Sequence, residues 1–153
     1  MFDKVLIANR GAIACRVIRT LKRMGIRSVA VYTHADAGSL HVSQADEAVL
    51  IGEGPANSSY VSGDTILQVA QQAGVGAIHP GYGFLSENAG FAQHCEESGI
   101  SFIGPTPEQI VSFGLKHTAR ELANQNKVPL LPGSGLLRAA TWAERMVPNK
   151  AWV

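Results

Sequence analysis

The sequence predicts a doubly wound α/β domain, in which an open, Rossmann-like parallel sheet carries helices on both faces. Short apolar runs of strand length recur along the chain, at residues 4–8, 28–32, 47–51, 76–79 and 100–103. Segments with the spacing of an amphipathic helix separate several of these runs. Strands that alternate with helices indicate βαβ crossovers, and continuously apolar strands are typical of a parallel sheet that is buried on both sides.

The first helix is expected directly after the first apolar run. Ile13, Val17 and Leu21 lie on one face of it, and Gly25 follows as the residue that ends it with positive φ. Further helices are expected over residues 64–73, over residues 87–98 with Ser86 as N-cap, over a short segment that ends at residue 113, and over residues 116–126.

Composition and charge restrict the class of protein. The chain has 153 residues, 46% of them hydrophobic and 16% charged, which fits one globular domain and excludes a disordered chain. A formal net charge of +1 without a Lys/Arg block gives no broad basic surface for nucleic acid. No apolar stretch approaches the ~20 residues of a membrane span, and no signal peptide precedes the first strand. We therefore expect a soluble, cytoplasmic protein.

The two cysteines, Cys15 and Cys95, lie far apart in helix-like segments. No CxxC or Cys/His spacing occurs, so no metal site is expected. Both are interpreted as small buried hydrophobes of a reducing compartment.

The first candidate site is the turn that joins the first apolar run to the first helix and contains Gly11. Backbone N–H groups at a helix start can hold an anion, but a tight turn that needs glycine for its geometry explains Gly11 equally well. The fingerprint GxGxxG is missing, which argues against an NAD site. A phosphoacceptor receiver domain shares the broad fold but needs clustered acids after the first strand, where Asn9 and Arg10 stand instead.

The second candidate site is the loop after the fourth apolar run, because ligands of open parallel sheets bind beyond the carboxyl ends of strands. Gly81 and Gly83 permit a close backbone approach, and Tyr82 between them offers a hydroxyl group and a ring. Structural interpretations remain open for the other polar residues. A hydrogen-bonded His79 at a strand end is common, and Glu87 in a first helical turn suits the helix dipole.

The third candidate is Lys116, at the start of a predicted helix. A cation there opposes the helix dipole unless an anion or an acid accompanies it. A phosphate contact and a solvated lysine are both compatible with this position.

Together these stretches resemble the biotin carboxylase family, the ATP-grasp enzymes of biotin-dependent carboxylases. The motifs are IANRG at residues 7–11, HPGYGFLSEN at residues 79–88, and FIGPTPE at residues 102–108 followed by the lysine helix. The resemblance runs in register from Met1 to about Leu137 and implies a sheet of the pre-ATP-grasp type.

The resemblance also implies a chemistry. In this family Mg-ATP phosphorylates bicarbonate to carboxyphosphate, which then carboxylates N1 of biotin on a carrier domain. By this resemblance Lys116 contacts the phosphates of ATP. The residues of the biotin and bicarbonate side of the cleft would be His79, Tyr82, Gly83 and Glu87.

Some positions depart from the family pattern. Arg16 and Arg19 match a surface through which bacterial members form homodimers, but a position that is often acidic there is Arg23. Ala12 and Leu115 also replace acids of the common pattern. The stretches NRGAIACR and FGLKHTARELA are similar to the urea carboxylase branch, the carboxylase half of urea amidolyase, which converts urea to allophanate.

The resemblance divides the chain into three parts. Residues 1–104 match the amino-terminal α/β domain, residues 105–137 match a helical linker toward the ATP-grasp body, and residues 138–153 match nothing in the family. Without that body we expect an amino-terminal fragment that does not catalyse the reaction alone. The alternative is a non-catalytic interaction or dimerisation domain.

Overall fold

The computed structural model describes residues 1–133. The chain divides into two compact units, Met1–Val111 and Ser112–Val153. The non-family tail expected at residues 138–153 lies outside the described residues. The whole sheet belongs to the first unit.

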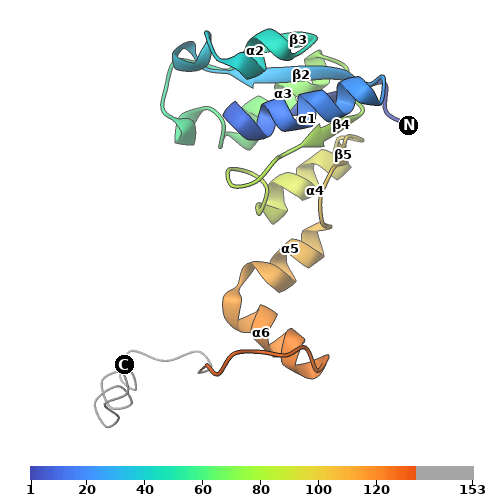
Figure 1. Cartoon of the computed structure of the whole chain (residues 1–153), viewed down its shortest axis with the longest axis vertical. Coiled ribbons are helices and arrows are strands. Elements are labelled where there is room, and N and C mark those ends of the chain that lie inside the picture. The colour runs from blue at the N-terminus through green and yellow to red at the C-terminus, as the bar shows by residue number, and fades with distance from the viewer. Residues whose placement is uncertain (134–153) are drawn as a thin grey trace. The chain divides into compact units, whose positions relative to one another are not determined.

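This sheet has five parallel strands in the order β3-β2-β1-β4-β5 (Figure 1). The strands are β1 (Lys4–Ile7), β2 (Arg27–Tyr32), β3 (Glu47–Leu50), β4 (Ala77–His79) and β5 (Ser101–Phe102). Leu6 of β1 lies opposite both Val29 of β2 and Ile78 of β4, so the first strand of the chain is the central strand. The predicted open parallel sheet is confirmed.

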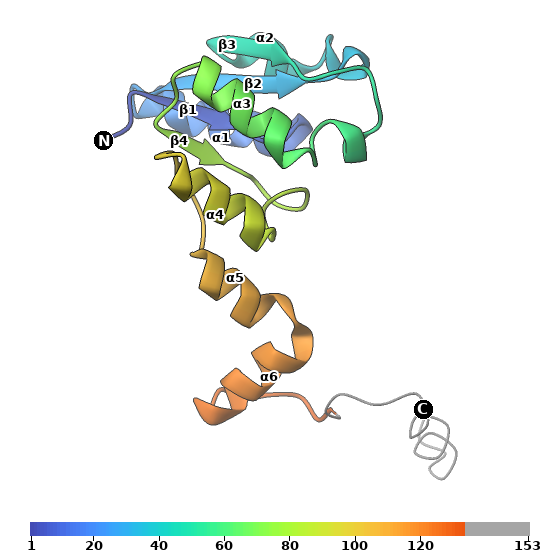
Figure 2. The same ribbon diagram turned by 180° about the vertical axis from the view of Figure 1, so that it is seen from behind.

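Helices cover both faces of the sheet (Figures 1 and 2). They are α1 (Gly11–Arg23), α2 (Leu40–Gln44), α3 (Gly63–Gln72) and α4 (Ala89–Glu97), with the short 3-10 turns η1 (His34–Asp36) and η2 (Ala56–Ser58). α1 packs on one face, and α3 and α4 pack on the other. The doubly wound α/β fold is therefore confirmed.

Side chains of β1 alternate between the two faces and join both cores. Val5 and Ile7 pack against α1, whereas Leu6 and Ala8 belong to the core beneath α3 and α4. The α1 side includes Ala14, Val17, Ile18, Leu21 and Ile26. The opposite side includes Ile66, Val69, Ala70, Phe91 and Cys95. Both cysteines are buried free thiols, as the sequence predicts.

The third strand is less buried than the sequence predicts. β3 forms the edge of the sheet, where Ala48 and Leu50 are exposed and Val49 is only partly buried. An apolar run of strand length carries no information about whether a strand is central or peripheral, because that depends on strand order.

The fourth helix begins later than predicted, and Ser86 is not its N-cap. Asn88 takes that role, since its side-chain oxygen accepts a hydrogen bond from the Phe91 N–H at 2.9 Å. Ser86 instead closes a turn by donating its N–H to the Gly83 carbonyl at 2.9 Å. Glu87 therefore lies directly before the N-cap and not in the first helical turn.

The two carboxy-terminal helices occur where the sequence predicts them, as α5 (Pro107–Gly114) and α6 (Lys116–Gln125). Gly25 has φ of 69° after α1, also as predicted. None of the helices in residues 1–133 combines the length and apolar composition needed to cross a bilayer. The division of the chain at residues 104 and 137 stays a prediction.

Candidate functional site

The candidate site lies where the strand order reverses direction. From β1 the chain proceeds outward to β2 and β3, and then returns to place β4 on the other side of β1. Ligands of open α/β sheets bind at such a point, beyond the carboxyl ends of the two diverging strands. Here the loops that meet are the turn after β1 and the loop between β4 and α4.

Asn9 joins these two loops. Its side-chain amide donates hydrogen bonds to the carbonyls of Pro80 at 2.8 Å and Tyr82 at 2.9 Å, and its oxygen accepts the Arg10 N–H at 2.9 Å. One residue earlier, the Ala8 N–H donates to the His79 carbonyl at 2.9 Å and extends the pairing of β1 with β4. Only 4% of Asn9 is exposed.

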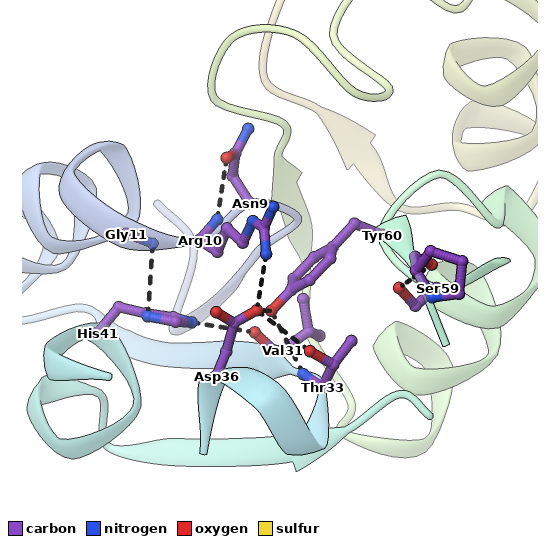
Figure 3. A network of polar contacts seen from close by, with 10 residues as sticks. Asn9, Arg10, Gly11, Val31, Thr33, Asp36, His41, Ser59 and Tyr60 are labelled. Atoms are coloured by element: carbon purple, nitrogen blue, oxygen red, sulfur yellow. Dashed lines mark hydrogen bonds and ion pairs between the residues drawn. The ribbon is translucent and has the colours of Figure 1, made fainter. Parts of the chain in front are cut away.

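A second polar network surrounds Asp36, in the turn η1 that follows β2 (Figure 3). One carboxylate oxygen accepts hydrogen bonds from the hydroxyl of Tyr60 at 2.7 Å, the hydroxyl of Thr33 at 3.1 Å and the guanidinium of Arg10 at 3.1 Å. The guanidinium carbon of Arg10 lies 5.2 Å from the centre of the Tyr60 ring, which stacks on Phe84 at 5.4 Å. Three segments distant in sequence, at Arg10, Thr33–Asp36 and Tyr60, thus meet at one carboxylate.

This network shifts the pKa values of its two acids in opposite directions. Burial is the largest influence on Asp36 and acts upward, but the hydrogen bonds from Tyr60, Arg10 and Thr33 together hold its pKa below the usual value. Burial and the neighbouring carboxylate raise the pKa of Tyr60 to about 12. At neutral pH the pair is therefore a carboxylate and a phenol, which fits the observed donation from Tyr60 to Asp36.

The start of α1 is occupied by a buried histidine. The N–H of Gly11 donates to Nδ1 of His41 at 3.4 Å, and Nε2 of the same ring lies 3.3 Å from the Val31 carbonyl. The ring is therefore neutral with its proton on Nε2, because Nδ1 must accept. This contact uses one of the N–H groups at the helix start that could otherwise have bound an anion.

Stability should fall on mild acidification because of this histidine. Burial lowers the pKa of His41 below its value of 6.5 in the unfolded chain, so the unfolded state takes up a proton first as the pH falls. We expect the urea midpoint to decrease from pH 7.5 to pH 5, and the decrease to be smaller in His41→Gln. The exposed His94→Gln serves as control, and an equal pH dependence in both variants would contradict the assignment.

The residues proposed for the biotin side do not all face the same way. Tyr82 is 68% exposed, and Gly83 and Glu87 are also exposed on the loop after β4. Nδ1 of His79 accepts the Gly81 N–H at 3.0 Å, while its ring lines a groove beside α1 together with Arg16. Burial lowers the pKa of His79, and the charge of Arg16 acts in the same direction.

The other predicted residues lie on helix surfaces. Arg16 and Arg19 are exposed on α1, where they line a shallow depression with Lys22 and Arg23. Lys116 is exposed as the first residue of α6, in the second unit. No group of three His, Cys, Asp or Glu side chains within residues 1–133 is arranged to hold a metal ion.

The polar residues that tie the loops together were not predicted as site residues. Asn9 and Arg10 stand in the IANRG motif, and Asp36 follows the second strand. Their signal in the sequence is position, since polar residues directly after parallel strands meet at one edge of a sheet. Tyr60 has no such signal, because η2 and the segment around it follow no strand directly.

Comparison with known proteins agrees with this arrangement. The family described as biotin carboxylase, N-terminal domain, matches residues 1–110. A biotin carboxylase of Halalkalibacterium halodurans is 60% identical over 139 residues, and a putative urea carboxylase of Emericella nidulans is 55% identical over 130 residues. These matches cover 91% and 85% of this chain but 31% and 10% of those proteins, so the chain spans less than a third of their length.

Solved structures give the same result. The urea amidolyase of K. lactis is 52% identical with a TM-score of 0.83, over 86% of this chain and 8% of that one. The biotin carboxylase domain dimer of the Hydrogenobacter thermophilus 2-oxoglutarate carboxylase, solved with MgADP, ADP and bicarbonate, is 48% identical with a TM-score of 0.89. That match covers 95% of this chain and 32% of the other. The chain belongs to the family of biotin carboxylase N-terminal domains.

Proposed function

We propose that this chain supplies the amino-terminal part of an enzyme that carboxylates biotin with ATP and bicarbonate. The observation that best supports this proposal is the structure of the loop after β4. Within residues 1–133, the backbone N–H groups of Tyr82 and Gly83 donate no hydrogen bond, and the Tyr82 ring beside them is exposed. Free donors next to an aromatic face suit a small planar ligand with polar oxygen atoms, such as bicarbonate or the ureido ring of biotin.

Lys116 is proposed to contact the phosphates of ATP. Its ammonium group stands at the first position of α6, and α6 has no side-chain cap and no acid in its first turn. A cation in this place is unfavourable beside the helix dipole, and a bound polyphosphate would remove that penalty. The Hydrogenobacter relative was solved with ADP, which supports a nucleotide ligand for the family fold.

The reaction is proposed to require the longer protein. ATP would bring Mg²⁺, which supplies charge neutralisation during phosphoryl transfer, and its ligands would come from outside residues 1–133. Each missing donor to a developing charge is worth about 2.7–4 kcal/mol, so one lysine and one loop do not replace them. Bicarbonate, a biotin carrier and the remaining ATP-grasp body complete the proposed assembly.

The proposed final acceptor is urea. The similarity of NRGAIACR and FGLKHTARELA to the urea carboxylase branch supports it, as do the fungal urea carboxylase and urea amidolyase relatives. The Halalkalibacterium relative, described only as a biotin carboxylase, is more similar in sequence, at 60% identity. A cytoplasmic location likewise stays a prediction.

Biotin-dependent ADP release tests the proposal. We expect none from the isolated 153-residue chain, and activity from a chimera in which residues 1–133 replace the matching segment of the Halalkalibacterium biotin carboxylase. Circular dichroism and thermal melting establish that both proteins are folded. A folded chimera that releases no ADP with bicarbonate and biotin would contradict the proposed function, and turnover by the isolated chain would show that a smaller unit suffices.

For the alternative of an interaction or dimerisation domain, the predicted contact surface is α1. The helix carries Arg16, Arg19, Lys22 and Arg23 and no acid. A two-fold symmetric contact would place this surface against itself, and like charges opposite each other are unfavourable. Dimer formation through Arg16 and Arg19 therefore stays a prediction, and the positive charge of Arg23 on the same helix argues against it.

A further inference from the structure

We propose that Asn9 is a positioning residue that fixes the backbone of the loop after β4 for ligand binding. The inference rests on the proposed function, because Tyr82 and Gly83 are the groups that Asn9 would position. Asn9 itself is buried and offers no atom to a ligand, since both hydrogens of its amide are already donated.

The orientation of the Asn9 amide is fixed by its partners. Nδ2 faces two carbonyl oxygens, those of Pro80 and Tyr82, and Oδ1 faces the N–H of Arg10. A flipped amide would set its oxygen against both carbonyls and its NH₂ group against an N–H. Asparagine is therefore required, because an aspartate of the same shape has no hydrogens for the two carbonyls.

Gly81 completes this arrangement from the other side. It lies between the two anchored carbonyls with φ of 68°, and a Cβ atom there would stand 2.7 Å from Nδ2 of Asn9. Its N–H donates to Nδ1 of His79. The Asn9 amide thus occupies the space that only glycine leaves free, and three hydrogen bonds hold the loop between Pro80 and Tyr82.

The consequence is a rigid support beneath exposed groups. The carbonyl of Tyr82 is held by Asn9, whereas its ring is exposed and its N–H and that of Gly83 are free within the described chain. Binding groups act best when their backbone is fixed before the ligand arrives. Loss of this support should therefore weaken binding at the loop more than it disturbs a nucleotide contact at Lys116.

Asn9→Asp is the principal test, because it keeps the shape and the acceptor for Arg10 but removes both donors. In the 153-residue chain we expect amide exchange of Gly81 to become at least about tenfold faster. Ile66→Val, a core change in α3, controls for a general loss of stability. Asn88→Asp is the matched chemical control, since aspartate caps a helix as well as asparagine does. Exchange no faster than in Ile66→Val would overturn the proposal.

The chimera gives the second readout. There Asn9→Asp should raise the KM for biotin about tenfold or more and leave the KM for ATP unchanged. A loss of kcat alone, or equal changes in both KM values, would show that Asn9 only stabilises the fold. If Asn9→Asp does not fold, Gly81→Ala tests the same contact without removing the amide. An inactive parent chimera would contradict the proposed function, whereas amide exchange would still decide whether Asn9 fixes the loop.

Discussion

Lys116→Ala should lower biotin-dependent ADP release by the chimera by about 10²–10³-fold, the usual effect of removing one donor to a developing charge. The lysine is exposed and makes no ion pair within residues 1–133, so its removal takes nothing from the packing. The melting temperature should therefore not fall. Rates at saturating ATP and thermal melting of the same samples measure both quantities.

Two comparison variants sharpen this test. Lys116→Arg keeps the positive charge but replaces the compact ammonium group by a planar guanidinium group, and should retain part of the activity. Lys22→Ala removes an exposed lysine from α1 and should leave the rate unchanged. Full activity of Lys116→Ala would exclude the proposed phosphate contact, and a parallel loss in Lys22→Ala would indicate a general effect of charge.

Tyr60→Ala should cost the most stability of any single change in the polar network, about 3–5 kcal/mol from the lost ring and the cavity. No part of Tyr60 is exposed, and its ring stacks on Phe84. Its hydroxyl donates a hydrogen bond to Asp36 and accepts one from the Thr33 N–H at 3.3 Å, and the substitution removes both hydrogen bonds. Urea unfolding followed by circular dichroism measures the change, with an unchanged m-value as the check for two-state behaviour.

Tyr60→Phe separates the hydroxyl from the ring. It should cost about 1–3 kcal/mol, because Asp36 loses one of its three donors and the Thr33 N–H loses its acceptor. Tyr82→Ala is the matched control, since the same substitution at a largely exposed ring should change stability little. A Tyr60→Ala variant as stable as Tyr82→Ala would refute the role of this network in the fold.

The candidate site was predicted only in part. The loop with Tyr82 and Gly83 was identified because glycines after a parallel strand favour a binding site, and the structure places it at the reversal of strand order. The ring of His79 lines the groove beside α1, and its place on the biotin side of the cleft stays a prediction. In β4, successive side chains alternate between faces, so His79 shares the face of Ala77.

The local sequence by itself determined the strands, the helices and the parallel sheet. Apolar runs and helical spacing act over a few residues, and several continuous apolar runs together favour a parallel sheet. Gly25 likewise follows from local conformation, since the end of α1 needs positive φ. The ordered motifs also determined the family, which needs no knowledge of contacts.

Only the tertiary structure decided which residues support the site. Asn9 and Pro80 are 71 positions apart and meet because β1 pairs with β4. Arg10, Asp36 and Tyr60 are also distant in sequence and come together only in the folded domain. The exposure of β3 also follows from its place at the edge. Strand order depends on how whole apolar faces pack against helices, and no local pattern encodes it. Hydrogen bonds between strand ends are therefore set only when the sheet is assembled.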